Sequence, residues 1–263
     1  MKPHRTAEPR APQLLCGTWL SVGSPVIAEL AAESGFDWLL FDLEHGCGSD
    51  AGLFGNLQAI KGTATASIVR VGAPYPDLIM RALDWGAAGI MVPHISTPAE
   101  AEACVQAMHY PPRGRRGVSR SVRAYAYGLR PMTSADQEQD PVLMVQIETV
   151  RAVDQAANIA RVAGVDVLFV GPGDLNYDIK VNDGVSDCSY ESCLTTVLAA
   201  ADAAGKQAGI LVRDVREVPP LVEMGFSLIA LDSDLAILRS GYQRNLEQLR
   251  KVEGARTTKV VGK

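Results

Sequence analysis

The stretch FDWLLFDLEHG, residues 36 to 46, joins an apolar run to three polar side chains. The run follows Gly35 and is rich in Leu and Phe, which predicts a buried strand. It ends in Asp42, Glu44 and His45. Because a buried charge is costly unless it is paired or used, these three residues indicate a site and not packing. Enzymes with parallel sheets place their chemistry at this end of a strand.

The composition is that of a globular protein with a large core. The chain has 263 residues, of which 47% are hydrophobic and 21% are charged, which suits one large or two small domains. The formal net charge of -5 argues against nucleic acid as a partner, because such binding depends on neutralising phosphates. The sequence also predicts no signal peptide and no membrane span, so we expect no membrane partner.

The cysteines predict a reducing compartment. There are five of them, they are scattered, and they form no C-x-x-C pair. We therefore expect unpaired thiols and a cytoplasmic location. The five are Cys16, Cys47, Cys104, Cys188 and Cys193.

Short apolar runs alternate with longer amphipathic segments along the whole chain. The runs predict strands at 14–21, within 36–46, and at 67–71, 88–94, 141–148, 165–171, 207–212 and 226–232. The amphipathic segments predict helices at 24–35, 50–61, 76–86, 97–109, 149–161, 189–204 and 214–224, and a long last helix from residue 233. Residues 110–140 form a long polar connection between the fourth and fifth strands.

Eight strand-helix units of this size predict an α/β fold, a (β/α)8 barrel with a long C-terminal helix. An open doubly wound sheet is the alternative, but the G-x-G-x-x-G turn of that fold is missing after the first strand. We expect a flexible leader at 1–13, a single catalytic barrel at 14–255 and a flexible tail at 256–263.

Two carboxylates follow neighbouring predicted strands, Glu148 after the fifth and Asp174 after the sixth. Carboxyl ends of parallel strands meet at one rim, so the two side chains are expected to converge. Two carboxylates with open positions suit Mg²⁺, Mn²⁺ or Co²⁺. Alternatively, Glu148 caps a helix and Asp174 closes a turn.

The turn around Asp174 is rich in glycine. In GPGDL, Gly171, Pro172 and Gly173 precede the carboxylate, and the glycines free main-chain N–H groups to point at an anion. Such a turn is weak support alone. Beside a metal pair, it predicts that a substrate carboxylate binds these amides.

His45 has the residue type and the place of a general base. A nearby carboxylate such as Asp42 can hold its imidazole in one orientation. Arg70 ends the third strand and is expected to bind an anion or to stabilise developing negative charge, while an ion pair with Asp42 is an alternative that excludes neither role. Asp84 is a further candidate, whose alternative is a charge near a helix end.

Other residues of the predicted rim receive weaker assignments. Trp19 is expected to be a wall of the pocket, and Cys47 a small lining residue. The other histidines have no spacing of a metal motif, so we predict no role for them; they are His4, His94 and His109. Six arginines of the polar connection predict either a shaped loop that binds the substrate tail or a solvated basic loop: Arg113, Arg115, Arg116, Arg120, Arg123 and Arg130.

The ordered motifs resemble the class II pyruvate-dependent aldolases of the HpcH/HpaI family, which includes 4-hydroxy-2-oxoheptanedioate and 2-dehydro-3-deoxyglucarate aldolases. They are GTWL, FDLEHG, VRV, DWGAAGIMVPHI, YPPRGRRGVS, VQIET and GPGDL, and the match covers roughly residues 14 to 250. Each motif is weak alone, but the ordered set is specific.

The resemblance implies a role for each of the candidate site residues. It implies that Glu148 and Asp174 bind the metal, that His45 transfers a proton, and that Arg70 faces the oxo oxygen. It also implies that Asp42 orients Arg70 and His45, and that Asp84 supports His45 across a subunit interface. Members of the family are typically hexamers, so the resemblance implies a homo-oligomer. The expected substrate-binding set is Trp19, Arg70, Gln146, Gly171, Pro172, Gly173, Asp174 and Val212.

Two departures from the resemblance bear on the pocket. Relatives often have Ser where this chain has Asn176, which concerns the pyruvate pocket, and an apolar residue where it has His94, which concerns the aldehyde. Within FDLEHG, pleat alternation separates Asp42 and Glu44 from His45 at the turn, so a change of Glu44 is expected to hurt least.

The expected reaction is cleavage of a 4-hydroxy-2-oxo acid to pyruvate, or a close 2-oxo acid, and an aldehyde through a metal-stabilised enolate. No organic cofactor is expected. A Schiff base is disfavoured because no lysine ends a predicted strand. The alternatives are a CoA-thioester carbon-carbon lyase of the citrate lyase beta or malyl-CoA type, and a non-catalytic barrel that binds oxo acids.

Overall fold

The computed structural model describes residues 13–133, 140–182 and 188–260, and its eight strands close into a barrel. Every strand is parallel to its neighbours, and β1 pairs with β8 to complete the circle. The predicted barrel is thus confirmed. The strands are β1 (Leu15–Leu20), β2 (Trp38–Asp42), β3 (Ala66–Arg70), β4 (Gly89–Val92), β5 (Val142–Ile147), β6 (Val167–Val170), β7 (Gln207–Val212) and β8 (Leu228–Ser233).

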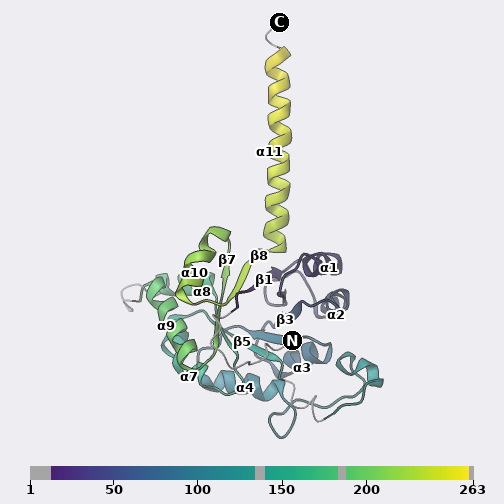
Figure 1. Ribbon diagram of the computed structural model, residues 1–263, viewed down its shortest axis with the longest axis vertical. Coiled ribbons are helices and arrows are strands. Elements are labelled where there is room, and N and C mark those ends of the chain that lie inside the picture. Colours follow the sequence, from purple (N-terminus) through teal and green to yellow (C-terminus); the bar gives the residue numbers. More distant parts are fainter. Residues whose placement is uncertain (1–12, 134–139, 183–187, 261–263) are drawn as a thin grey trace.

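Helices surround the barrel in chain order, and the last one stands away from it (Figure 1). They are α1 (Pro25–Glu33), α2 (Asp50–Ala59), α3 (Pro76–Asp84), α4 (Pro98–Met108), α6 (Val150–Asp154), α7 (Ala156–Ala160), α8 (Pro172–Val181), α9 (Tyr190–Ala203), α10 (Val218–Met224) and α11 (Asp234–Val260). Two short 3₁₀ helices, η1 (Arg123–Gly128) and η2 (Val215–Glu217), lie in the connections.

The helix α8 was not predicted. We interpreted GPGDL as a turn because of its glycines and proline, whereas the structure makes Gly171 the N-cap and Pro172 the first residue of a helix. Proline suits that first position because its fixed φ is helical and its missing N–H has no partner there. Asp174 therefore lies in the first turn of α8.

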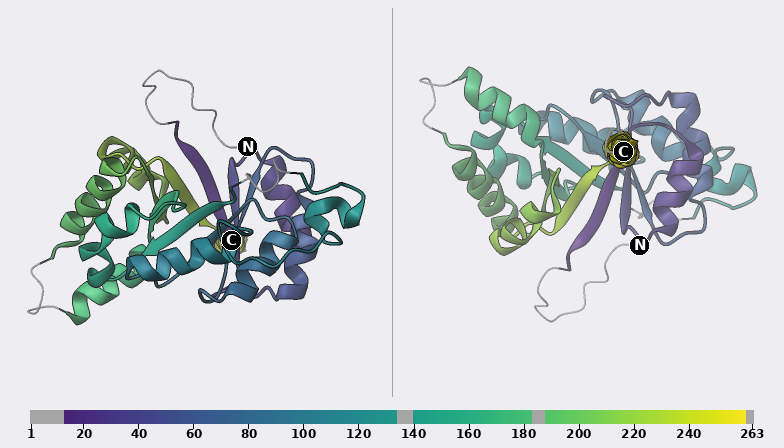
Figure 2. Two further views of the ribbon diagram at one scale, coloured as in Figure 1. Left: turned by 90° about the horizontal axis from the view of Figure 1, so that it is seen from below. Right: turned by 90° about the horizontal axis from the view of Figure 1, so that it is seen from above.

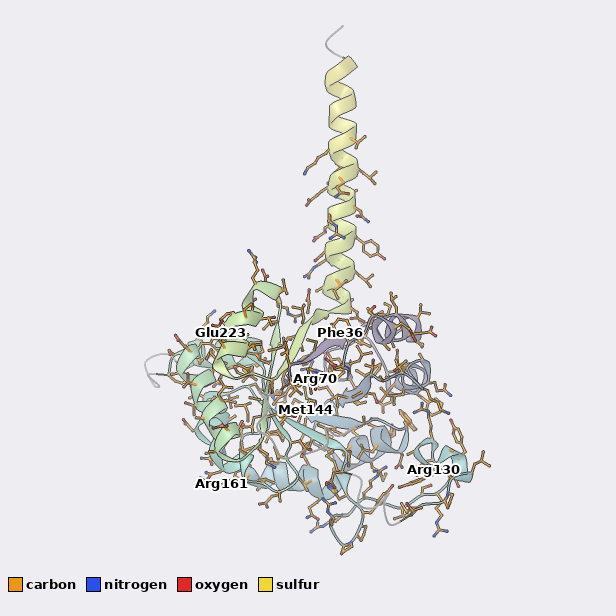
Figure 3. The ribbon with its side chains drawn as sticks, viewed as in Figure 1. Phe36, Arg70, Arg130, Met144, Arg161 and Glu223 are labelled. Carbon is orange, nitrogen blue, oxygen red and sulfur yellow. A yellow bond between two sulfur atoms is a disulfide. The ribbon has the colours of Figure 1, made fainter. Side chains whose placement is uncertain are left out.

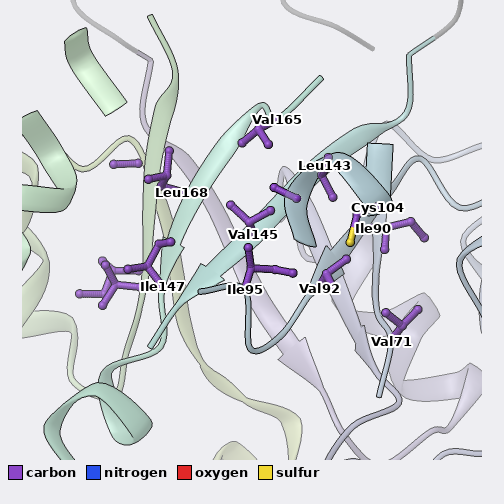
Figure 4. Close-up of a cluster of buried hydrophobic side chains, with 14 of the residues drawn as sticks. Val71, Ile90, Val92, Ile95, Cys104, Leu143, Val145, Ile147, Val165 and Leu168 are labelled. Atoms are coloured by element: carbon purple, nitrogen blue, oxygen red, sulfur yellow. The ribbon is translucent and has the colours of Figure 1, made fainter. Parts of the chain in front are cut away.

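The period of two along each strand divides the core into an inner and an outer layer. Trp38 and Leu40 of β2 point into the barrel and pack with an inner cluster that includes Met144 and Phe169. The intervening Leu39 and Phe41 point outward and pack against the helices. Part of the outer layer is shown in Figure 4, where Ile90 of β4, Leu143 of β5 and Cys104 of α4 belong to one cluster of buried side chains.

The same alternation places polar side chains above the inner cluster. Each polar residue stands two positions after an inward-pointing apolar residue of the same strand. The pairs are Leu40 and Asp42 on β2, Ile68 and Arg70 on β3, and Met144 and Gln146 on β5. Each lies at the carboxyl end of its strand, on the inner side. The apolar layer closes the barrel beneath them, so this end carries the polar groups.

The last helix, α11, begins at the same end of the barrel. Its first residue, Asp234, is buried and accepts hydrogen bonds from the main-chain nitrogens of Ser21 and Val22 at 2.9 and 3.0 Å. The rest of the helix projects outward and is seen end-on in Figure 2. It continues through Val260, so residues 256–260 of the predicted tail are helical; residues 1–12 and 261–263 lie outside the described ranges.

The cysteines differ from expectation, because Cys188 and Cys193 form a disulfide at the start of α9. The helical turn brings their Cα atoms to 6.5 Å, within bridging range. The predicted absence of paired thiols is therefore wrong.

Within the described ranges, no helix is both long and apolar enough to span a bilayer.

Candidate active site at the carboxyl end of the barrel

Arg70 and Asp42 form the buried centre of the site. The Arg70 Nε donates to Asp42 Oδ1 at 3.0 Å, and Nη2 donates to Oδ2 at 2.8 Å. Burial alone would raise the pKa of Asp42, but Arg70 and two main-chain N–H groups outweigh it and hold the pKa below its ordinary value. The expected orientation of Arg70 by Asp42 is present, and Figure 3 shows Arg70 inside the barrel.

Five side chains from four strand ends form a closed ring of polar contacts. Arg70 Nη1 lies 2.9 Å from Glu44 Oε2, and Glu44 Oε1 lies 3.1 Å from His94 Nε2. His94 Nδ1 lies 2.8 Å from Glu148 Oε1. Gln146 Nε2 donates to Glu148 Oε2 at 3.2 Å, and Gln146 Oε1 accepts from Arg70 Nη1 at 3.4 Å. We call this set the polar ring.

His94 is the member of the polar ring that the sequence analysis missed. We predicted no role for it because its spacing matches no metal motif, yet it follows β4 just as Glu148 follows β5. Its main-chain φ of 58° lies in the left-handed region, and its own N–H donates to Glu148 Oε1 at 2.6 Å. Its position at a strand end was the signal that could have found it.

Glu44 also lies deeper in the site than we expected. Its side chain is 8% exposed and contacts both Arg70 and His94. Pleat alternation, which separates it from His45, predicts only a supporting role for Glu44. In the structure it joins the guanidinium of Arg70 to the imidazole of His94.

Glu148 and Asp174 are the carboxylates that suit a divalent cation. Burial raises the pKa of Glu148, the His94 contacts lower it, and the charges of Asp174 and Glu44 raise it again. A bound cation would relieve this crowding of negative charge. Among the described residues no three His, Cys, Asp or Glu side chains converge as a metal site. The binding of a cation by Glu148 and Asp174, with water and substrate oxygens as further ligands, stays a prediction.

The GPGDL segment, which begins α8, lies directly against Glu148. A Cβ at Gly171 would meet Glu148 Oε2 at 2.9 Å and its Cβ at 3.1 Å, so a larger residue there would displace the carboxylate. Gly173 has open space around its Cα. The binding of a substrate carboxylate to the main-chain amides of this segment stays a prediction.

His45 lies at the edge of the site. Its imidazole is 69% exposed and its Nε2 is 3.8 Å from Glu44 Oε1. Asp42 Oδ1 accepts from the His45 main-chain nitrogen at 3.2 Å, so Asp42 holds the loop that carries His45. The proton-transfer role of His45 stays a prediction.

Asp84 contacts a different partner within this chain. It ends α3 and pairs with Arg116 Nη2 at 2.6 Å, in a separate cluster of the polar connection. Arg116 also stacks on Tyr110, with 4.6 Å from its Cζ to the ring centroid. The expected support of His45 by Asp84 from a neighbouring subunit stays a prediction.

Two predicted lining residues differ in where they point. Trp19 belongs to the inner cluster, and the Arg70 guanidinium lies 5.4 Å from its ring centroid. Val212 packs in the outer layer and lines a groove of about 690 Å³ together with Gly173 and Arg213. Trp19 is therefore a floor of the site, while Val212 borders the neighbouring groove.

A comparison with known proteins identifies the family of this chain. The family model for HpcH/HpaI aldolase/citrate lyase matches residues 15–240. The chain belongs to that family.

Relatives of this HpcH/HpaI protein match over most of their length. The 5-keto-4-deoxy-D-glucarate aldolase of Salmonella arizonae is 36% identical over 241 residues, which are 92% of this chain and 94% of that one. A crystal structure of a family member from Burkholderia cenocepacia J2315 has a TM-score of 0.85 at 36% identity and covers 91% of this chain and 95% of that one. An HpcH/HpaI aldolase from Desulfitobacterium hafniense DCB-2 has a TM-score of 0.82 at 29% identity, with coverages of 91% and 94%.

Family membership confirms the resemblance that the sequence motifs carried. The curated relatives are aldolases, which supports an aldolase-type lyase.

Proposed function

We propose that the protein is a divalent-metal-dependent class II aldolase that cleaves 4-hydroxy-2-oxo acids. The products are pyruvate, or a close 2-oxo acid, and an aldehyde. The observation that carries this proposal is a buried guanidinium, Arg70, held at the carboxyl end of the barrel within the same polar ring as Glu148. A fixed positive charge there is matched to an oxygen that gains negative charge.

Glu148 and Asp174 would hold the cation, with water and substrate oxygens completing its coordination. When bound, the cation supplies Lewis-acid stabilisation of the negative charge that grows on the oxo oxygen. Arg70 donates to the same oxygen, and Asp42 keeps its guanidinium in place. Both contributions act on charge that is largest in the transition state.

His45 acts as the general base for cleavage. It removes the proton of the 4-hydroxyl group, the bond between C3 and C4 breaks, and the aldehyde leaves. The electron pair of that bond stays on the other fragment as an enolate, which takes up a proton at C3 to give the 2-oxo acid. In the condensation direction the same imidazole returns the proton. The exposed ring of His45 is free to reach a substrate at the rim.

A Schiff-base mechanism finds little support in the site. The buried polar and charged side chains of the described residues include no lysine. A lysine that forms a Schiff base needs a buried or cationic setting that lowers its pKa. The carboxylates and Arg70 therefore favour the metal-dependent mechanism.

The decisive experiment combines metal removal, covalent trapping and proton exchange. EDTA is expected to abolish cleavage and Mg²⁺ or Mn²⁺ to restore it, while borohydride with pyruvate leaves no adduct on the protein. NMR should show metal-dependent exchange of the pyruvate methyl protons. Covalent trapping with metal-free activity would overturn the mechanism, and absence of exchange would favour a barrel that only binds oxo acids.

The name of the curated relatives makes 5-keto-4-deoxy-D-glucarate the first substrate to assay. Other 4-hydroxy-2-oxo acids then define the aldehyde. Cleavage of a malyl-type CoA thioester in place of these acids would point instead to the CoA-thioester lyase. We also propose a homo-oligomer, a hexamer by the resemblance, assembled through α11.

A further inference from the structure

We propose that His94 is a positioning residue for Glu148, which it aligns so that one acceptor position, on Oε2, stays open to a divalent cation. This inference rests on the proposed metal dependence. It concerns a residue that the sequence motifs left without a role, and it follows from the contacts of the two carboxylate oxygens.

The two oxygens of Glu148 have different numbers of partners. Oε1 accepts from the His94 main-chain nitrogen at 2.6 Å and lies 2.8 Å from His94 Nδ1. Among the described residues, Oε2 accepts a hydrogen bond only from Gln146 Nε2, at 3.2 Å. A carboxylate oxygen has about two acceptor positions, so Oε1 is filled and Oε2 keeps one.

The backbone of His94 makes this double contact possible. Its φ of 58° lies in the left-handed region, which aims the N–H and the side chain at the same oxygen. The His94 side chain is 64% exposed whereas that of Glu148 is 3% exposed. Packing alone therefore leaves the ring largely free, and its contacts to carboxylates hold it.

The second ring nitrogen joins His94 to the rest of the polar ring. Nε2 lies 3.1 Å from Glu44 Oε1, and Glu44 in turn contacts Arg70. The two nitrogens thus make two separable contacts, one toward Glu148 and one toward Glu44. Partners of this kind orient metal ligands, and their loss typically weakens metal binding by about 10- to 100-fold.

Four variants separate the side-chain contact from the backbone. His94→Asn places an amide nitrogen near the position of Nδ1 and tolerates the left-handed backbone. His94→Leu has nearly the same shape as Asn but no donor. His94→Gly keeps the main-chain N–H and removes any strain at φ 58°. Ser96→Ala removes a hydroxyl from the same loop, which contacts Thr149 and not Glu148.

The measurement is the dissociation constant of Mn²⁺ by titration calorimetry, with melting temperatures to confirm that each variant folds. His94→Leu and His94→Gly are expected to bind Mn²⁺ about 10- to 100-fold more weakly than the unchanged protein. His94→Asn and Ser96→Ala are expected to bind within about threefold of it.

Each result has a defined meaning. If Leu and Gly variants bind Mn²⁺ as tightly as the unchanged protein, or if the Asn variant is as weak as the Leu variant, the positioning role is wrong. Weak binding by Leu with normal binding by Gly would trace the effect to backbone strain and also overturn it. Failure of the unchanged protein to bind Mn²⁺ would instead remove the proposed function, and the inference with it.

Discussion

Asp42 and Arg70 occupy paired positions on adjacent strands, β2 and β3, and meet through two hydrogen bonds of 3.0 and 2.8 Å. Their side chains are 3% and 8% exposed. The planar guanidinium matches the carboxylate in a two-point contact that fixes its direction. Arg70 therefore has one orientation before any substrate arrives.

The first prediction concerns the stability that this pair supplies. Asp42→Asn leaves a buried guanidinium short of its main partner, so unfolding at pH 7 should cost about 3–5 kcal/mol less. Urea unfolding curves give this difference. Asp50→Asn is the control, because its pair with Arg81 at 2.6 Å is exposed and should be worth less than about 1 kcal/mol. Equal losses in both variants would contradict the assignment.

The pH dependence of the same difference is a second prediction. The pKa of Asp42 is lower in the folded protein than its ordinary 3.8, since Arg70 outweighs the cost of burial. A lowered pKa stabilises the fold above the unfolded pKa, and this stabilisation disappears as the pH falls through the folded pKa. The difference in unfolding free energy between the unchanged protein and Asp42→Asn should be constant from pH 8 to about 5. It should shrink in urea titrations at lower pH. A gap that widens in acid would refute it.

The third prediction separates the charge of Arg70 from its shape. Arg70→Lys keeps a positive charge, but one ammonium group cannot contact Asp42 twice while it also reaches Glu44 and Gln146. We expect kcat/KM for a 4-hydroxy-2-oxo acid to fall by about 10²- to 10³-fold. Steady-state kinetics with Mn²⁺ at saturation measure this. Activity within threefold of the unchanged protein would show that charge alone suffices.

Local patterns were enough to predict the barrel and the centre of its site. Strand alternation and the rim rule put Asp42, Arg70, Gln146 and Glu148 together, and the structure joins all four. Asp42, Arg70 and Gln146 lie on strands, where a period of two fixes the direction of each side chain, and Glu148 directly follows β5. Position in the sequence was therefore sufficient to predict which side chains meet.

The residues that escaped prediction lie on loops and helix ends. His94 reaches Glu148 only because its φ is 58°, and nothing in the sequence of a histidine predicts that angle. Asp84 pairs with Arg116 across 32 positions through the fold of the polar connection. In GPGDL the same glycines and proline suit a turn or a helix start, so α8 was missed. Contacts of this kind depend on tertiary geometry.

The fourth prediction tests the order of Glu44 and His45. His45→Ala removes the proposed general base and should lower kcat by about 10²- to 10⁴-fold. Glu44→Gln keeps one acceptor oxygen, but its NH₂ group must point at a donor of either Arg70 or His94. We therefore expect kcat to fall by about 10- to 100-fold. Because His45 is exposed, added imidazole should restore part of the activity of His45→Ala and none of that of Glu44→Gln. A Glu44→Gln variant as inactive as His45→Ala would show this order to be wrong.

The last prediction concerns the helix that leaves the barrel. At about 1.5 Å per residue α11 is about 40 Å long, and Figure 1 shows it standing clear of the barrel. A stripe of large apolar side chains with spacings of three and four runs along it and is exposed: Leu235, Leu238, Tyr242, Leu246 and Leu249. Such a stripe is the pattern of a helix face that packs against another element.

We expect this stripe to bind a second copy of the chain. Leu246→Gln together with Leu249→Gln should lower the molar mass measured by light scattering after size exclusion, because burial of each leucine contributes about 1.5–3 kcal/mol to an interface. The control, Glu247→Gln with Lys251→Gln, changes the opposite side of the helix and removes no apolar side chain, so its mass should stay that of the unchanged protein. An unchanged mass in the leucine variant, or a monomeric protein from the start, would rule out assembly through α11.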